Sequence, residues 1–144
     1  MVISLASAQA LVGSVSCLAA GYVEVMSVTR IVPNLPVTDV ARANELYAQI
    51  FELGVGMDLG WVGNLAPADA PAVQLQVMTS DASAPSNPTI SVGVADPAEV
   101  DAIHERVVAA ALEIVHPLTD EDWGVRRFFF RDHDGNVVNV VAHR

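Results

Sequence analysis

The sequence predicts an α+β fold built from two similar βαβββ modules, and three observations lead to this prediction. Two aspartates that each follow a short apolar run, Asp39 and Asp96, begin helical patterns at an offset of 57 residues (96 − 39). At the same offset, Leu46 on the apolar stripe of the first helical pattern corresponds to Ile103 in the second. The chain ends in two β-prone runs joined by an Asp-rich turn at Gly135, which is a strong hairpin signal. A strand, a helix and three short strands therefore occur twice, which indicates an internal repeat.

The first module is expected within residues 26–88, together with its linker. It begins with a strand over 29–37, where two prolines restrict the strand to an edge or to positions without a ladder donor. Asp39 is expected to cap a helix that runs to about Leu53, with Gly54 as its C-terminal stop. Three short strands are predicted to follow, near 55–59, 61–66 and 73–79.

The second module is expected over residues 89–144, after a linker over 81–88 that is rich in Ser, Ala and Pro. It begins with a strand over 89–94 and a helix with Asp96 at the N-cap, Pro at the first helical position and a capping-box Glu. A short strand over 112–117 leads into the terminal hairpin. Neither module closes a sheet around its own core, so residues 26–144 are predicted to share one domain.

The composition limits the possible classes of function. The chain has 144 residues, of which 52% are hydrophobic and 17% charged, and this balance excludes a disordered protein. Its net charge is −10 and it contains no Lys, so we expect no nucleic acid and no membrane surface as a partner, whereas a cationic small molecule would suit it. The single cysteine, Cys17, excludes an intrachain disulfide framework and a Cys-based zinc site.

Residues 1–25 differ in composition from the rest of the chain. They are small and apolar without any Lys or Arg, so they lack the basic region of a secretory signal, and their polar residues keep them below the hydrophobicity of a membrane span. We interpret them as an extension upstream of a natural start at Met26, with a loosely packed helix as its most ordered form. The predicted location of the protein is the cytoplasm.

Two motifs, together with the repeat, resemble those of the vicinal oxygen chelate superfamily. They are the Val37-Thr38-Asp39-Val40 start of the first helix and the ending from Trp123-Gly124-Val125-Arg126-Arg127 to Arg131-Asp132-His133-Asp134-Gly135-Asn136. This superfamily includes glyoxalase I, extradiol dioxygenases, fosfomycin-resistance enzymes and bleomycin-resistance proteins. The resemblance covers residues 28–144 and is greatest for the glyoxalase-like, bleomycin-resistance-like branch. It implies that each module curls its sheet into a half-barrel and that a ligand lies in the resulting cup.

The resemblance also implies positions for metal ligands, and these positions argue against a metal. They fall on Val32, Thr89 and Asn139, with Gln74 or Gln76 as the fourth. A divalent ion held by neutral oxygens alone would lack the charge attraction that offsets its dehydration. We therefore predict no metal and no other cofactor. His116 is interpreted first as a loop histidine and second as a ligand at the rim.

The candidate ligand-binding residues are the amides, hydroxyls and aromatic groups expected inside the cups. Strand alternation places Asn34 on the face of Val32, and Ser91 on the face of Thr89. An amide in the middle of the buried strand 137–141 must also find a partner or face a cavity. The predicted set is Asn34, Trp61, Gln74, Gln76, Ser91, Trp123, Arg126 and Asn139.

Some of these residues have alternative interpretations. Trp61 and Trp123 are equally well explained as core residues. Arg126 and its neighbour Arg127 point to opposite faces of their strand, and the sequence does not show which of them lines the cup. The acidic run 120–122 is either a solvated loop or an acidic lip beside an aromatic ring, which would suit a cation.

These observations lead to three hypotheses for the function. The first is a metal-independent protein that binds and sequesters a small cationic or aromatic molecule, as a homodimer whose subunits complete each other's cups. The second is a lyase, isomerase or dioxygenase of the same superfamily with a non-standard metal site. The third is a structural or partner-binding module. The first accounts best for the missing metal ligands and the amide-lined strands.

Overall fold

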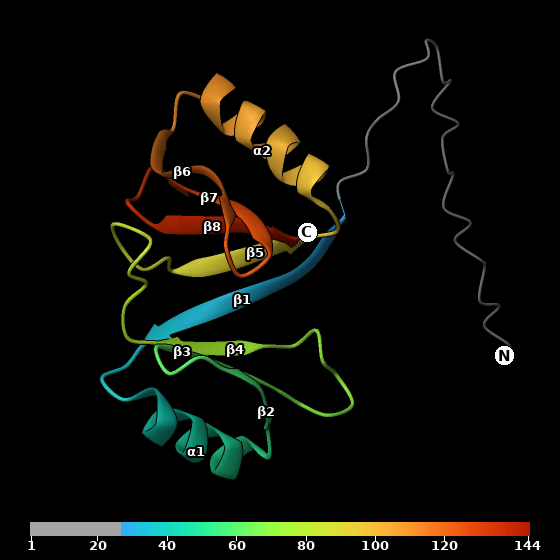
Figure 1. The fold of residues 1–144 in the computed structure, drawn as a ribbon, viewed down its shortest axis with the longest axis vertical. Coiled ribbons are helices and arrows are strands. Elements are labelled where there is room, and N and C mark those ends of the chain that lie inside the picture. Colours follow the sequence, from blue (N-terminus) through green and yellow to red (C-terminus); the bar gives the residue numbers. More distant parts are fainter. Residues whose placement is uncertain (1–26) are drawn as a thin grey trace, which may run out of the picture.

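The computed structural model describes residues 27–144, so the predictions for residues 1–25 lie outside the described residues. The described chain contains two helices and eight strands, with one helix at either end of the molecule (Figure 1). The elements in chain order are β1 (Val28–Pro36), α1 (Val40–Phe51), β2 (Gly54–Asp58), β3 (Val62–Ala66), β4 (Leu75–Met78), β5 (Ile90–Val94), α2 (Pro97–Ala109), β6 (Glu113–Glu121), β7 (Val125–Arg131) and β8 (Val137–His143).

The eight strands form one mixed sheet in the order β2-β3-β4-β1-β5-β8-β7-β6. The central strands β1 and β5 are antiparallel, and each is parallel to the last strand of its own half, β4 and β8 respectively. The first half consists of β1, α1, β2, β3 and β4, and the second of β5, α2, β6, β7 and β8. The predicted α+β fold of two βαβββ modules is therefore confirmed.

Both helices begin at the predicted aspartates. The Asp39 carboxylate accepts a hydrogen bond from the backbone N–H of Arg42 at 2.9 Å, and the Asp96 carboxylate accepts one from Glu99 at 3.1 Å. The Glu99 side chain in turn accepts the backbone N–H of Ala95, so it bonds the residue before the N-cap and not the N-cap residue of an ideal capping box. The end of α1 differs from the prediction, because Glu52 rather than Gly54 takes the left-handed conformation with φ of 54°.

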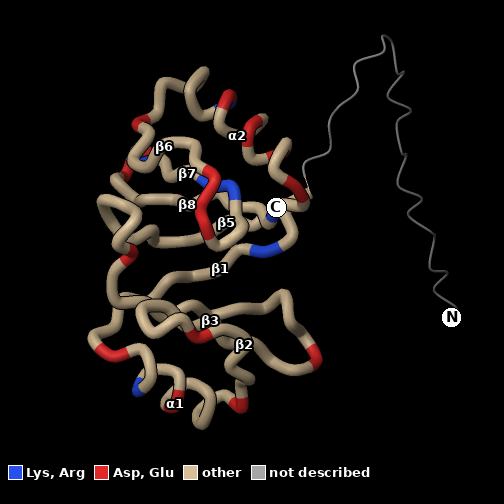
Figure 2. The backbone as a smooth tube through the Cα atoms, viewed as in Figure 1, with Lys and Arg blue, Asp and Glu red and all other residues tan. Residues whose placement is uncertain are grey.

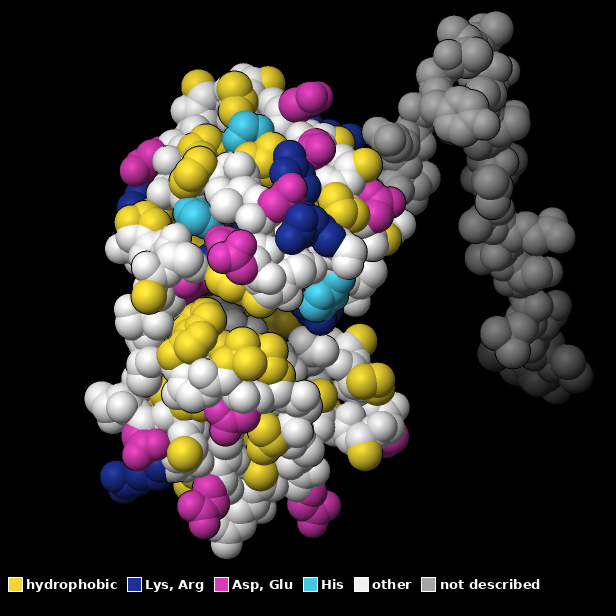
Figure 3. All heavy atoms as spheres, viewed as in Figure 1, with side chains coloured by type: hydrophobic (Ala, Val, Ile, Leu, Met, Phe, Trp, Pro, Cys, Tyr) yellow, Lys and Arg dark blue, Asp and Glu magenta, His cyan; other side chains and the backbone are white. Residues whose placement is uncertain are grey.

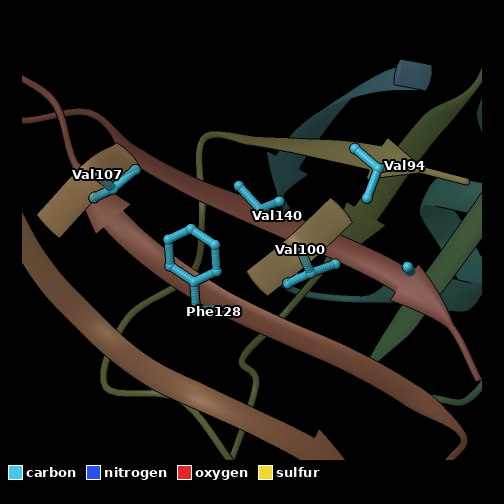
Figure 4. Close-up of a cluster of buried hydrophobic side chains, with 6 residues drawn as sticks. Val94, Val100, Val107, Phe128 and Val140 are labelled. Carbon is cyan, nitrogen blue, oxygen red and sulfur yellow. The ribbon is translucent and has the colours of Figure 1, made fainter. Parts of the chain in front are cut away.

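Each helix packs on one face of its half of the sheet, and alternation along the strands assigns the side chains to the two faces. Leu65 of β3 and Val77 of β4 are fully buried against α1. Phe128 of β7 and Val140 of β8 are buried against Val100 of α2 and its neighbours (Figure 4). On each strand, the residues that alternate with these buried ones point to the opposite, concave face of the sheet, which contains the candidate site.

Strand β6 is longer than the strand predicted over 112–117. It pairs with β7 as far as Glu121, and its register shifts on both sides of His116 accommodate Pro117 at the edge of the sheet. The acidic residues Asp120 and Glu121 therefore belong to a strand and not to a loop.

Neither of the two helices described between residues 27 and 144 is long and apolar enough to cross a membrane.

Candidate functional site

A cavity of about 130 Å³ lies on the concave face, between the two halves of the sheet. Figure 3 shows hydrophobic side chains gathered at the waist between these halves. The first half contributes Arg30, Val32, Met57, Leu59, Trp61, Val62 and Gln76 to the lining, and the second contributes Ser91, Trp123, Val125, Arg127, Asn139, Val141 and His143. Apolar groups and two indole rings therefore surround a small number of polar groups.

A second hollow of about 320 Å³ shares Leu59, Trp61 and Trp123 with this cavity. It is bounded on its other side by the segment 80–83. A larger hollow of about 470 Å³ lies beside the start of α1, where the polar side chain of Asp39 is already used to cap the helix. Since that hollow contains none of the predicted site residues, the cavity between the halves is the better candidate site.

The floor of the cavity contains a buried group of two amides and a hydroxyl. Ser91 lies directly opposite Val32 of β1 and Asn139 of β8 in the two ladders. The Asn34 Nδ2 donates to Ser91 Oγ at 3.1 Å, and the Asn139 Nδ2 donates to the same oxygen at 3.0 Å. Because two donors occupy the lone pairs of the Ser91 oxygen, its O–H remains to donate to another group.

The two amide oxygens of this group lack partners. Asn34 and Asn139 are each 7% exposed, and neither Oδ1 has a hydrogen-bond partner among the described residues. An unpaired buried acceptor costs about 1–3 kcal/mol. Asn139 contributes to the lining of the cavity, but its Oδ1 is itself enclosed by protein, so the amide forms a fixed part of the floor and not an exposed acceptor.

These residues do not fit the divalent metal that the resemblance implies. Ser91, and not the exposed Thr89, lies in the row with Val32 and Asn139, so the predicted metal position at Thr89 is displaced by two residues. The row supplies no carboxylate and no imidazole, and the guanidinium of Arg30 in the same lining would repel a cation. Nowhere within residues 27–144 do three or more His, Cys, Asp or Glu side chains gather around a possible metal position.

The wall of the second half is held by a buried ionic network centred on Arg127. Its Nε donates to Glu121 Oε1 at 2.7 Å, and one terminal nitrogen donates to Asp81 Oδ2 at 2.7 Å. The other terminal nitrogen donates to Ser83 Oγ at 2.8 Å. His116 Nε2 lies 2.9 Å from the same Glu121 oxygen, so the strand β6, the strand β7 and the segment 81–83 are joined in one network.

The network lowers the pKa of the Asp81 carboxyl group. Burial alone would raise the pKa of Asp81, but the hydrogen bonds from Arg127 and Ser83 and the positive charge of Arg127 together hold the pKa below its usual value. The Arg127 guanidinium also lies 4.8 Å from the ring centre of Trp123 and 4.9 Å from that of Phe129. Arg127 is therefore fixed on every side and holds Trp123 at the edge of the cavity.

Arg126, which was predicted to bind the ligand, is not among the residues that line the cavity. It pairs with Ala142 in the β7–β8 ladder and points toward α2, whereas the adjacent Arg127 pairs with Val141 and points to the concave face. Arg126 donates to Asp101 at 2.7 Å and to Asp120 at 2.9 Å, and these bonds raise its pKa.

The acidic run 120–122 is divided between strand β6 and the turn that follows it, where Asp122 is exposed. Glu121 is buried and bonded to Arg127, while Asp120 is bonded to Arg126. Arg127 already contacts the Trp123 ring, so the cation–π position beside these acids is filled by the protein itself. His116, interpreted from sequence as a loop or rim residue, is buried within β6.

The structure brings together five of the predicted site residues in the lining: Trp61, Gln76, Ser91, Trp123 and Asn139. Asn34 lies behind them, bonded to Ser91. Gln74 lies outside the lining, where it accepts a hydrogen bond from Asn64 and donates to the Pro71 carbonyl. The two indoles are not core residues, because Trp61 is half-buried and Trp123 is 46% exposed.

Sequence reasoning missed Arg30 and Asp81, and it left open whether Arg126 or Arg127 lines the cavity. Arg30 is paired in the β1–β5 ladder with Gly93, and a glycine in a strand often marks a close approach by another group. Asp81 stands two residues before Ser83, with which it forms a local turn. Both signals are present in the sequence, but neither reveals a partner on a distant strand.

Comparisons with known proteins agree with this arrangement. The model of the Glyoxalase/Bleomycin resistance protein/Dioxygenase superfamily matches residues 27–140. A comparison with curated proteins found no match.

Several solved structures are similar in fold. A chain described as an NAD-dependent benzaldehyde dehydrogenase from Legionella pneumophila is 17% identical, with a TM-score of 0.67, over 79% of this chain and 99% of that one. A glyoxalase/bleomycin resistance protein/dioxygenase superfamily member from Vibrio splendidus 12B01 is 14% identical, with a TM-score of 0.58, over 78% and 97%. Methylmalonyl-CoA epimerase from Mycobacterium tuberculosis is 15% identical, with a TM-score of 0.57, over 82% and 88%. At these identities the likeness shows the fold alone. The family is shown by the model match over residues 27–140: the chain belongs to the Glyoxalase/Bleomycin resistance protein/Dioxygenase superfamily.

Proposed function

We propose that this protein binds a small molecule in the cavity between its two halves, without a metal ion. The observation that carries the proposal is the row Val32, Ser91 and Asn139 on the cavity floor. Where a metalloenzyme of the superfamily would need charged or imidazole ligands, this row offers a methyl group, a hydroxyl and an amide. Such groups can orient an organic molecule by hydrogen bonds and contact, but they cannot compensate a divalent ion for the loss of its water.

The shape of the cavity supports a ligand of limited size. Its volume of about 130 Å³ is close to that of an engineered cavity of about 150 Å³ that accommodates benzene. The adjacent hollow, which shares both indoles, offers room for a substituent on such a ring. Sequestration of a drug, as in bleomycin resistance and antibiotic resistance more generally, is the finer form of the proposal, since it requires binding and no catalytic group.

Tryptophan fluorescence offers a direct test, because the chain has only two tryptophans and both line the cavity. Small aromatic compounds would be titrated into the protein and into the variants Trp61→Phe and Trp123→Phe, each of which retains one indole. We expect a saturable change in both variants with similar midpoints, since the two indoles face the same molecule from different halves. A change confined to one variant would place the ligand elsewhere. Saturable binding in neither would contradict the proposal.

Elemental analysis of protein purified without a chelator distinguishes the proposal from its enzymatic alternative. We expect no stoichiometric transition metal. One bound Mn, Fe, Ni or Zn ion per chain would instead favour a lyase, isomerase or dioxygenase with a non-standard site.

We also propose that the protein forms a homodimer. Exposed apolar side chains on α1 and β2 support this, and they include Leu46, Ile50, Phe51 and Val55. A second copy covering them would remove their apolar surface from water. Light scattering coupled to size exclusion would show twice the chain mass of 15.2 kDa, and a monomer at all concentrations would contradict the proposal. The cytoplasmic location remains a prediction, for cell fractionation to test.

A further inference from the structure

We infer that the molecule bound in this cavity is a small aromatic carboxylate, whose negative group pairs with Arg30. The inference rests on the proposed function and extends it by naming the class of ligand. It begins from an arginine that the rest of the site leaves without a partner.

Arg30 reaches the cavity by passing over Gly93, where the absence of a side chain leaves room for it. It lies opposite Gly93 in the β1–β5 ladder, and Gly93 lies opposite Val141 of β8. A Cβ built on Gly93 would be 2.7 Å from the Arg30 Cγ and 2.8 Å from its Nε, closer than real side chains approach. The Arg30 side chain therefore extends over β5, from the first half toward the second, and lies on the cavity floor.

The guanidinium of Arg30 has no hydrogen bond or ion pair to any group among residues 27–144. Other arginines near the sheet are neutralised by carboxylates: Arg126 by Asp101 and Asp120, and Arg127 by Asp81 and Glu121. Arg30 thus differs from them although it is half-buried. A partly buried cation without a counter-charge is suited to receive one from a ligand.

The surroundings of Arg30 favour a negative ligand over a positive one. Arg30 is the only Asp, Glu, Lys or Arg on strands β1, β3, β4, β5 and β8, and Figure 2 shows the acidic residues on the helices, the connecting segments and the outer strands. Among residues 27–144, no carboxylate lines the cavity. The net charge of −10 acts over long distances, but salt screens it beyond about 8–10 Å at physiological ionic strength.

The remaining lining explains why the anion should carry an aromatic body. Trp61 and Trp123 line the cavity from opposite halves, and aliphatic side chains lie between them. The Ser91 O–H can donate to an oxygen of the ligand, because the Ser91 oxygen already accepts from Asn34 and Asn139. A ring with a carboxylate would therefore satisfy Arg30 and Ser91 together.

The test uses three probes of nearly the same shape: benzoate is anionic, benzamide neutral and benzamidine cationic. Binding of each to the full chain would be followed by calorimetry and tryptophan fluorescence. We expect benzoate to bind about tenfold more tightly than benzamide, as for one charge-assisted hydrogen-bonded pair at a partly exposed site, and benzamidine to bind most weakly.

Two variants assign the preference to Arg30. Arg30→Met should abolish the preference for benzoate over benzamide, with a larger loss of affinity for benzoate than for benzamide, because it removes the positive charge and retains an unbranched side chain over Gly93. The control is Arg42→Met, on the exposed surface of α1, which changes the net charge equally and should preserve the preference. The backbone fold of each variant would be verified by circular dichroism and thermal unfolding.

The outcomes separate this inference from the proposed function. If all three probes bind with equal affinity, or if Arg30→Met retains the preference for benzoate, the inference is wrong and the proposed function stands. If the preference disappears in Arg42→Met as well, long-range charge and not Arg30 is responsible. If none of the probes binds at up to about 10 mM, where even weak ligands of this size are detected, both are contradicted.

Discussion

The two halves of this molecule share one topology but stabilise the walls of the cavity by different chemistry. In the second half, Arg127, Glu121 and His116 form a buried network together with Asp81 of the connecting segment. In the first half, β2 is exposed along its whole length. Duplication of a module therefore preserves strands and caps but does not preserve the interactions that fix a wall. We expect the second half to be rigid and the first to adapt to the ligand.

Removing the centre of the network gives the largest expected effect. Arg127→Met would leave two buried carboxylates without a counter-charge, and we expect the free energy of unfolding to fall by about 3–5 kcal/mol. The matched control is Arg126→Met, which removes the same charge from a more exposed pair and should cost about 1 kcal/mol or less. Urea unfolding at neutral pH measures both.

Similar losses in the two arginine variants would remove the distinction between the buried network and the outer ion pairs. Should Arg127→Met fail to fold, combining it with Asp81→Asn and Glu121→Gln is expected to restore folding, because the unpaired charges are then absent. A triple variant that is no better than the single one would contradict this explanation.

A substitution in the hydrogen-bonded group on the cavity floor should have an intermediate effect on the free energy of unfolding. Ser91→Ala removes the acceptor of two buried amides, and we expect a loss of about 1–3 kcal/mol in the free energy of unfolding. Gln74→Ala removes a half-buried amide pair from the first half and should cost about 0.5 kcal/mol. Chemical unfolding measures both losses in stability. Equal losses would show that the hydrogen bonds to Ser91 on the cavity floor stabilise the fold no more than the Gln74 pair outside the lining.

The smallest effect is a pH dependence that belongs to the buried network, through Asp81 of the connecting segment. The pKa of Asp81 is lowered on folding, so its contribution to stability is present above its usual pKa of 3.8 and is lost as the pH falls through the folded-state value. At pH 7 the wild type should be more stable than Asp81→Asn. The difference should shrink below about pH 4, where the carboxyl becomes protonated. Unfolding curves at several pH values would show it, and a difference that stays constant would contradict the assignment.

The features predictable from the sequence are those that local signals encode. The caps at Asp39 and Asp96, the repeat and the hairpin at Gly135 depend on residues that are close in the chain. Strand alternation also placed Asn34 and Ser91 on the face of the cup that the resemblance implied, whereas the sequence left open whether the two indoles belong to the core or to the cavity.

The network and Arg30 depend instead on contacts between distant segments. Asp81 and Arg127 are 46 residues apart, and nothing local indicates that they meet. The same holds for Arg30 and Gly93, which come together only through the register of β1 and β5. Alternation separates Arg126 from Arg127, but only the pairing with β8 shows which of the two faces the cavity.

The central claim is that the cavity between the halves binds its ligand without a metal, and a titration with and without chelator tests it most directly. Tryptophan fluorescence would be recorded as benzoate is added to protein dialysed against EDTA, and to the same protein supplied with Mn²⁺, Ni²⁺ or Zn²⁺. We predict the same affinity and the same signal change in every case. Binding that disappears in EDTA and returns with one of these ions would contradict the account and indicate a metalloenzyme.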